Sequence, residues 1–283
     1  MITLENALNQ GRAVLKEKGI TDWDLDAWYL LSYYFQVNRT QFIMHSQKEI
    51  TEEQLNFYLE LIQKRSKHIP LQYITGEQEF MGLKFRVTED VLIPRQDTEI
   101  LVEEVLKVSG GKDILDLCTG SGCIIISLSK LGNIKSGVGV DISPKALEIA
   151  RENAGKLQAD VTFIESDIYT QVRGKYDIII SNPPYIPTQD IAVLMEEVKD
   201  HEPVLALDGS TDGLYFYKNI IHDINLYLKP DGYVFFEIGY NQADAVSELL
   251  REAGITEIKV KKDLAGLNRV ISGRLKKTQE PFT

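Results

Sequence analysis

The residues with the clearest capacity for chemistry are Asn182, Pro183, Pro184 and Tyr185, which directly follow an apolar run at residues 176–181. The two prolines fix φ and bias the preceding residues towards extended geometry, so this turn is stiff. A planar nitrogen, as in an amide or exocyclic amine, is a poor nucleophile because its lone pair is delocalised. We expect the Asn182 side-chain oxygen and the Pro183 carbonyl to accept its hydrogens, while the Tyr185 ring covers its flat face. The alternative is a proline-rich strand end without chemistry.

A glycine-rich turn upstream is the second candidate, because it follows an apolar run that ends at Leu117 and precedes another that starts at Ile124. Open α/β sheets bind ligands at the carboxyl ends of their strands, where such turns lie. Glycine allows the positive φ that these turns need and lets a ligand approach the backbone closely. A plain strand-to-helix turn remains the alternative. The residues of the turn that we expect to contact a ligand are Asp116, Cys118, Thr119, Gly120, Ser121 and Gly122.

Two acidic residues end or follow the next two apolar runs. Asp141 closes the run Val-Gly-Val-Asp, where its carboxylate can accept hydrogen bonds from both hydroxyls of a ribose. Asp141 could instead cap a helix, although Ser143 followed by proline offers another start signal. Asp167 follows the run at residues 161–164 and could accept from an adenine amino group, with Ile168 packed on the ring. The pattern therefore predicts a nucleoside site, which Asn182 would border.

A dinucleotide site is the main competing interpretation, since its GxGxxG fingerprint also has an acidic residue about 20 positions further on. Ile125 occupies the position of the third glycine in this chain. That departure and the Asn-Pro-Pro-Tyr turn both count against an NAD-dependent oxidoreductase and against a non-catalytic nucleoside-binding module.

The elements that must position these residues alternate between short apolar strands and helical segments from about residue 112 onward. This rhythm is typical of an α/β fold in which a parallel sheet has helices on both faces. The two strand-like runs at 256–260 and 269–274 have no helix-length segment between them, so an antiparallel pair is expected at the C-terminal sheet edge. The other strands are expected around residues 114–117, 138–141, 161–164, 178–180 and 234–236.

The first 75 residues show apolar side chains at helical spacing, among them Leu25, Trp28, Tyr29 and Leu31. Thr51 and Gln54 have the spacing of a capping box at the start of a later helix. Alternating residues around 80–87 are typical of a hairpin. We therefore expect a helical domain at 1–75, a hairpin linker at 76–93 and a larger domain at 94–283.

Composition narrows the class of partner. The net charge is −11, and acidic and basic residues are mixed along the chain, which argues against a protein that grips a long nucleic-acid duplex. A basic start with an apolar core, as in a signal peptide, is missing, and no run of 18 apolar residues occurs. A cytoplasmic protein with no membrane partner is expected. Cys118 and Cys123 lie too close together to staple a domain. The histidines at 45, 68, 201 and 222 lack metal-ligand spacing, so no metal is predicted.

Taken together, the glycine turn, Asp141 and the Asn-Pro-Pro-Tyr turn resemble class I S-adenosylmethionine methyltransferases that methylate amino groups. Two further segments narrow the resemblance. Residues 92–99 read Leu-Ile-Pro-Arg-Gln-Asp-Thr-Glu, and residues 202–209 read Glu-Pro-Val-Leu-Ala-Leu-Asp-Gly, followed by Asp-Gly-Leu at 212–214. Both look like the release factor glutamine methyltransferase family, also called HemK or PrmC, and the resemblance covers nearly the whole chain.

This resemblance implies a Rossmann-like methyltransferase fold and an enzyme that methylates the glutamine N5 of the Gly-Gly-Gln motif in class 1 peptide chain release factors. It also implies S-adenosyl-L-methionine as donor, S-adenosyl-L-homocysteine as product, and an N-terminal module that docks the release factor. We expect a monomer. Arg95 and Glu99 could close the site around the donor or form a salt bridge between domains, and Glu237 is equally open.

Two related activities remain as alternatives. Many family members carry glycine where this chain has Cys118, and the sister methyltransferase of ribosomal protein uL3 often reads Asp-Leu-Cys-Thr-Gly-Ser-Gly there. The segment Gln-Asp-Thr-Glu at 96–99 favours release factors instead. A nucleic-acid base methyltransferase would flip a base into the same pocket. It predicts a basic cleft and a separate recognition domain, for which neither the charge nor the length gives support.

Overall fold

The computed structural model describes residues 2–276, which divide into two compact units. A helical unit comprises the chain up to Glu77 together with Met195–His201. A larger α/β unit comprises Gln78–Leu194 and the residues from Glu202 onward. The association of Met195–His201 with the helical unit has no signature in the sequence pattern.

The helical unit packs its helices around one apolar core. Trp28 and Leu31 are buried in this core, whereas Leu25 and Tyr29 on the same helix are about half exposed. The predicted capping box is confirmed, because Thr51 and Gln54 exchange side-chain to backbone hydrogen bonds. The helices are α1 (Leu4–Glu17), α2 (Trp23–Phe35), α3 (Arg39–His45), α4 (Glu52–Arg65), α5 (Leu71–Thr75) and the short α10 (Glu196–Lys199).

A buried arginine connects three segments of the helical unit. Arg65 on α4 donates from Nε to the Asp26 carboxylate of α2 at 2.6 Å, and its guanidinium also pairs with Glu197 of α10. Burial raises the pKa of Asp26, although Arg65 acts in the opposite direction. A buried guanidinium keeps its charge, so two carboxylates are needed to offset the cost of removing it from water. Arg65 thereby fixes the short segment around α10 to α4.

The stretch expected as a hairpin contains two short strands, β1 (Glu77–Phe80) and β2 (Leu83–Arg86), which form a two-stranded sheet. Met81 and Gly82 between them both have positive φ. Phe80 and Phe85 are fully buried and contact each other edge to face at 6.0 Å between ring centroids. Their burial in the core of the α/β unit anchors this small sheet.

The α/β unit is built on a seven-stranded sheet with the order β5-β4-β3-β6-β7-β9-β8. The first five of these strands pair in parallel, and β9 pairs antiparallel with both β7 and β8. The predicted fold class and the antiparallel C-terminal edge are confirmed. The strands are β3 (Asp113–Leu117), β4 (Ser136–Asp141), β5 (Thr162–Glu165), β6 (Tyr176–Ser181), β7 (Leu228–Glu237), β8 (Ile255–Lys262) and β9 (Asn268–Leu275).

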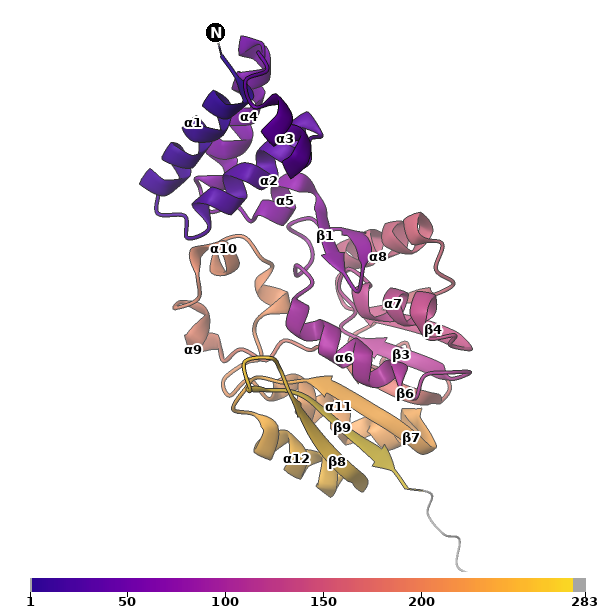
Figure 1. Ribbon diagram of the computed structural model, residues 1–283. Helices are drawn as coiled ribbons and strands as arrows, with labels where there is room; N and C mark the ends of the chain where they lie inside the picture. Colours follow the sequence, from indigo (N-terminus) through magenta and orange to yellow (C-terminus); the bar gives the residue numbers. More distant parts are fainter. Residues whose placement is uncertain (1, 277–283) are drawn as a thin grey trace, which may run out of the picture. The chain divides into compact units, whose positions relative to one another are not determined.

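Helices cover both faces of this sheet (Figure 1). Side chains alternate between the faces of a strand, so Ile178 and Ile180 pack in one core cluster while Ile179 packs in the other. The first cluster lies under α6 (Gln96–Leu106), α7 (Cys123–Leu131) and α8 (Pro144–Leu157). The second lies under α11 (Tyr215–Tyr227) and α12 (Ala243–Glu252). The connecting segments also carry α9 (Thr188–Ile191) and the 3₁₀ turn η1 (Val204–Ala206).

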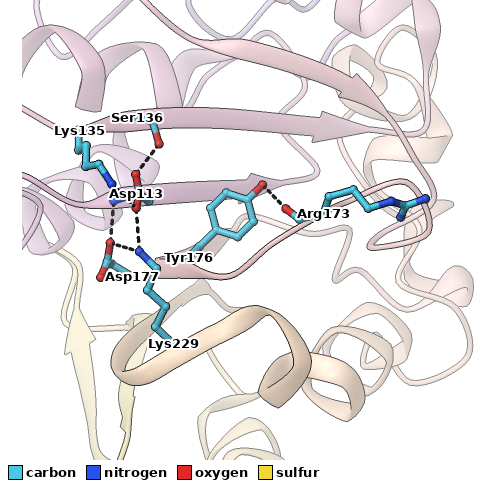
Figure 2. Close-up of polar contacts among 7 residues, drawn as sticks. All are labelled: Asp113, Lys135, Ser136, Arg173, Tyr176, Asp177 and Lys229. Atoms are coloured by element: carbon cyan, nitrogen blue, oxygen red, sulfur yellow. Dashed lines mark hydrogen bonds and ion pairs between the residues drawn. The ribbon is translucent and has the colours of Figure 1, made fainter.

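The amino-terminal ends of the parallel strands are held by a cluster of charges (Figure 2). The Lys229 ammonium of β7 lies 2.7 Å from the Asp113 carboxylate of β3 and 2.8 Å from the Asp177 carboxylate of β6. Lys135 and the Ser136 hydroxyl donate to Asp113 as well, at 3.1 and 2.8 Å. Hydrogen bonds from Lys229 and Ser136 lower the pKa of Asp113 well below its usual range. The cluster ties four adjacent strands, β4, β3, β6 and β7, together at one end of the sheet.

None of the helices within residues 2–276 is both long enough and apolar enough to span a bilayer.

Candidate functional site

A cavity of about 270 Å³ lies at the carboxyl ends of the parallel strands, opposite the charge cluster around Asp113. Most of the residues singled out from the sequence line it. The sequence-predicted residues in its wall are Arg95, Cys118, Thr119, Gly120, Ser121, Asp141, Asp167, Ile168, Asn182 and Pro184. Asp116, Gly122, Pro183 and Tyr185 do not contribute to the wall.

Asp141 lines the cavity and does not cap a helix. Ser143 is the N-cap of α8, with Pro144 at the first helical position. The Asp141 carboxylate instead accepts the backbone N–H of Gly120 at 2.8 Å and that of Ser143 at 2.9 Å. Burial raises the pKa of this carboxyl, and the backbone hydrogen bonds from Ser143 and Gly120 oppose the rise. The backbone N–H of Ile142 opposes the rise as well, and since a carboxylate has about four acceptor positions, at least one remains.

The two glycines of the turn have different roles. Gly120 has φ +55°, lines the cavity, and a Cβ placed there would meet no protein atom within 4 Å. Its missing side chain therefore leaves room for a ligand. Gly122 has φ +79°, and a Cβ there would stand 2.8 Å from Ile126 and 3.2 Å from Ala150. Gly122 allows α7 and α8 to pack closely, which differs from the ligand approach expected of it.

Asp116 lies beneath the turn and is fully buried. Its Oδ2 accepts the Thr119 hydroxyl at 2.6 Å, whereas its Oδ1 has no hydrogen-bond partner among the described residues. Burial is the main reason that its pKa rises to about 7, with the Asp141 charge adding to the rise and Thr119 opposing it. Asp116 thus supports the turn through Thr119 from outside the cavity wall.

Both cysteines are free thiols near the cavity. Cys118 has a positive φ of 59°, which is uncommon for a residue with a Cβ. Burial raises the pKa of the Cys118 thiol well above its usual range, and burial raises the pKa of Cys123 to about 12. The thiols therefore stay protonated and pack as small apolar groups.

Asp167 and Ile168 form another part of the cavity wall. Ser166 shapes their turn, because its hydroxyl donates to the Ile168 carbonyl at 3.1 Å and accepts the Gln171 N–H at 2.9 Å. Ile168 has φ +47° in this turn. The turn places the Asp167 carboxylate and the Ile168 side chain in the same cavity as Asp141.

The Asn-Pro-Pro-Tyr turn meets the cavity through Asn182 and Pro184. The Asn182 amide donates from Nδ2 to the Thr98 hydroxyl of α6 at 3.3 Å. Pro183 is buried, and Tyr185 directs its hydroxyl to Glu237 Oε1 at 3.2 Å. Burial raises the pKa of Tyr185, and the negative charge of Glu237 adds to the rise. The Tyr185 hydroxyl therefore stays protonated and acts as a donor.

Residues around 202–214 hold the backbone of Tyr185. Residues Ile186 and Asp208 form a parallel bridge, and a Cβ on Gly213 would lie 2.4 Å from the Tyr185 carbonyl oxygen. Gln242 donates from Nε2 to that same carbonyl at 2.9 Å. Sequence reasoning missed Gln242, since an isolated glutamine 57 residues away carries no motif.

The segment at the start of α6 also has defined partners. Arg95 lines the cavity and pairs with the buried Glu202. Glu99 accepts the Met81 backbone N–H at 2.6 Å. Both contacts lie within the α/β unit. The ion pair with Glu202 holds Arg95 in the cavity wall, and the hydrogen bond of Glu99 holds the β1–β2 turn. Among residues 2–276, no group of three or more His, Cys, Asp or Glu side chains is placed to hold a metal ion.

Solved structures share this fold at low sequence identity. A methyltransferase from Pyrococcus furiosus has a TM-score of 0.54 at 18% identity, covering 69% of this chain and 90% of its own. The catalytic domain of hMettl16 has a TM-score of 0.58 at 17% identity, covering 89% and 93%. With the cavity at the carboxyl edge of the sheet, these likenesses define a class I methyltransferase fold.

Proteins of similar sequence show which family of methyltransferases the chain belongs to. Residues 6–76 match the PrmC N-terminal domain and residues 95–212 match the methyltransferase small domain. Proteins named release factor glutamine methyltransferase are 39% identical in Geobacter sulfurreducens, covering 96% of this chain and 97% of that protein, and 40% identical in Clostridium acetobutylicum, covering 95% and 97%. The chain belongs to the release factor glutamine methyltransferase family.

Proposed function

We propose that this protein transfers a methyl group from S-adenosylmethionine to the side-chain nitrogen of the glutamine in the Gly-Gly-Gln motif of class 1 release factors. The observation that carries the proposal is the near full-length similarity to relatives named for this activity. The site adds chemical support, because Asn182 lines the same cavity as Asp141 and Asp167, the two acidic residues expected to bind a nucleoside.

The donor fits the polar groups of the cavity. Asp141 would accept a hydrogen bond from the ribose hydroxyls, and Asp167 would accept the adenine amino group beside Ile168. Gly120 would leave space for the donor against the backbone. When bound, the donor supplies the methyl group that its positively charged sulfur carries. The demethylated donor is S-adenosylhomocysteine.

The acceptor side would act on the glutamine amide. The Asn182 side-chain oxygen and the Pro183 carbonyl would accept its two hydrogens, which localises the nitrogen lone pair and aims it at the methyl carbon. Tyr185 lies outside the cavity wall, where Glu237 and Gln242 hold it in a fixed orientation, so its ring would cover one face of the amide where the acceptor extends beyond that wall. The C–N bond would form as the C–S bond of the donor breaks, and the amide proton that is lost would pass to solvent water.

We also propose that the release factor docks on the helical unit. The α2 helix exposes Leu25, Tyr29 and Tyr33 to 47%, 53% and 43%, and their spacing of four residues places them on one face. An apolar face of this kind suits a protein partner. Tyr29→Ser should raise KM for a release factor and leave donor affinity unchanged, and an unchanged KM would remove this face from the docking proposal.

The proposed activity is tested with methyl-labelled S-adenosylmethionine and three separate acceptors: an unmethylated release factor, ribosomal protein uL3 and unmethylated DNA. We expect label on the release factor, and none on its variant with Gln→Ala in the Gly-Gly-Gln loop. Label on uL3 or DNA alone would overturn the proposal. Label that survives the Gln→Ala change would place the methyl group elsewhere.

Substitution of Asn182 tests whether this residue acts on the methyl acceptor and not on the donor. Asn182→Ala should lower kcat by about 100-fold or more while the dissociation constant for S-adenosylhomocysteine changes little. Equal losses in both quantities would show that Asn182 serves the donor and not the acceptor.

A further inference from the structure

The side chain of Gln242 connects three loops at the carboxyl edge of the parallel strands. Gln242 stands at the start of α12 and is 7% exposed. Its Nε2 donates to the Tyr185 carbonyl at 2.9 Å and to the Gly213 carbonyl at 3.1 Å. Its Oε1 accepts the Gly239 N–H at 2.8 Å. Tyr185 follows β6, Gly213 precedes α11 and Gly239 follows β7, so one amide joins the three loops.

The backbone groups around Gln242 allow its amide only one orientation. The two carbonyls can only accept, and the Gly239 N–H can only donate. A flipped amide would set its oxygen against two carbonyl oxygens and its NH₂ group against an N–H group. The backbone N–H of Gln242 also donates to the Gly239 carbonyl at 2.9 Å. The turn between these two residues therefore closes on itself and holds the side chain in place.

Two glycines make the space that the amide needs. A Cβ on Gly213 would stand 2.7 Å from Gln242 Nε2, and a Cβ on Gly239 would stand 2.9 Å from Gln242 Oε1. Gly213 also has φ +71°, a conformation that side chains disfavour. Neither glycine can carry a side chain unless Gln242 moves, so the three residues are fitted to one another.

The Tyr185 carbonyl depends on Gln242 because the neighbouring backbone pairing starts one residue later. Ile186 donates its N–H to the Leu207 carbonyl at 3.1 Å and accepts the Gly209 N–H at 2.8 Å. The Tyr185 carbonyl lies just before this pairing and receives the Gln242 amide. Without that amide the carbonyl would lose a hydrogen bond and keep the cost of its partial burial.

The two ends of Tyr185 are held from different elements. Gln242 of α12 holds the carbonyl, and Glu237 at the end of β7 accepts the hydroxyl at 3.2 Å. A ring that is fixed only at its hydroxyl can still turn with its backbone, whereas two anchors fix the plane of the ring. The contact with Gln242 therefore bears on the orientation of the ring as well as on the stability of the loop.

We propose that Gln242 is a positioning residue for methyl transfer, which holds the carbonyl of Tyr185 so that the tyrosine ring stays against the methyl acceptor. The identity of that acceptor rests on the proposed function. Gln242 does not belong to the cavity wall, so it acts through Tyr185 and not on the substrate. Asp141 and Asp167 belong to β4 and to the turn after β5, on the other half of the sheet. Donor binding should therefore not depend on Gln242.

Gln242→Met and Leu250→Ala form the test and its control. Methionine has nearly the length of glutamine but can form none of the three hydrogen bonds. With a release factor as substrate, Gln242→Met should lower kcat by about 10- to 100-fold, with an unchanged dissociation constant for S-adenosylhomocysteine. Leu250 is buried in the same helix, and its truncation lowers stability without removing a contact of Gln242.

The Leu250→Ala enzyme should keep the wild-type kcat at a temperature where it is folded. A wild-type kcat in Gln242→Met would overturn the proposal. Equal losses of kcat in the two variants would overturn it as well, because general loosening of α12 would then explain both.

The Tyr185 carbonyl can also be observed without a substrate. Labelling with ¹³C-carbonyl tyrosine and ¹⁵N-isoleucine selects tyrosine carbonyls that precede an isoleucine, and the sequence has two such pairs, at 73–74 and 185–186. In Gln242→Met the Tyr185 carbonyl signal should move upfield because the carbonyl loses a hydrogen bond, while the Tyr73 signal stays in place as an internal reference. An unmoved Tyr185 signal would overturn the role of Gln242 even if no release factor were methylated. An inactive wild type with the expected movement in Gln242→Met would overturn only the proposed function.

Discussion

Gly209 lies against Tyr185 so closely that a Cβ built on Gly209 would stand 2.8 Å from the Tyr185 Cα. No side chain fits in that space without moving the backbone of the tyrosine. The loop that follows the Asn-Pro-Pro-Tyr turn is therefore part of the machinery that sets the position of Tyr185, although it does not belong to the turn itself.

Gly209→Ala should displace Tyr185 and lower kcat by about 10-fold or more, because small shifts in reacting groups are costly. Steady-state kinetics with a release factor would measure this. Gly155→Ala is the control, since Gly155 lies in α8 and a Cβ there would meet no atom within 4 Å. That change should leave kcat unaltered and stabilise the helix by about 0.5–1 kcal/mol. A Gly209→Ala enzyme with wild-type kcat would refute the positional role of the loop.

Asp141→Ala should weaken the binding of S-adenosylhomocysteine by about 10- to 100-fold, since it removes the charge-assisted hydrogen bonds that we propose to the ribose and frees the Gly120 N–H. Calorimetric titration would give the dissociation constant. Asp160→Ala removes an exposed carboxylate of equal charge and should leave the constant unchanged. If Asp160→Ala weakened the binding of S-adenosylhomocysteine as much as Asp141→Ala does, long-range charge and not direct contact would explain the weaker binding.

Asp116→Asn should stabilise the fold above pH 4. Burial raises the pKa of Asp116 to about 7, so the folded state holds a proton that the unfolded state releases near pH 4. The contribution of Asp116 to the wild-type free energy of unfolding is therefore greatest below pH 4 and falls as the pH rises towards 7. The amide side chain of the variant does not titrate, so the variant does not lose this contribution. Its free energy of unfolding should exceed that of wild type by an amount that grows between pH 4 and 7, reaches about 4 kcal/mol at most, and then stays constant.

Urea unfolding of wild type and Asp116→Asn at several pH values would measure that advantage. The amide oxygen can still accept the Thr119 hydroxyl, so the turn should keep its shape. An advantage that did not vary between pH 4 and 7 would contradict the buried-proton explanation.

Lys229→Met should destabilise the sheet by about 1 kcal/mol at neutral pH, because the pair is partly exposed to solvent. Lys229 lowers the pKa of Asp113, so its contribution is present above pH 4 and is lost as the pH falls further. The difference from wild type in urea unfolding should shrink below pH 4. Lys135→Met removes the more exposed lysine and should cost less. A larger loss for Lys135→Met would contradict the central place of Lys229 in Figure 2.

Much of the fold was predictable because its signals are local. Apolar runs marked the strands, and the glycine turn marked the first crossover. Asp141 ends β4, and Asp167 and Asn182 follow β5 and β6, which are parallel strands of the same sheet. Parallel strands end at one edge of a sheet. Their shared cavity could therefore be expected from their order along the chain.

The contacts that brace the site could not be expected in this way. Thr98 and Asn182 are 84 residues apart, and Gln242 and Tyr185 are 57 apart. Such pairs depend on how α6 and the loop before α12 pack on the sheet, for which no local pattern exists. Gly122 illustrates the same limit, because its packing against α7 and α8 has the same sequence signature as a ligand-binding glycine.

The position of Glu237 at the end of β7 has a consequence for biosynthesis. Asp141 and Asp167 are in place once the first three strands of the sheet have been made, but Tyr185 awaits Glu237 and Gln242, and Glu237 lies opposite Val270 of β9. A chain that ended before β7 would lack both side chains that hold Tyr185, Glu237 and Gln242. It would also lack the part of the core that β7, β9 and α12 share with β3 and β4.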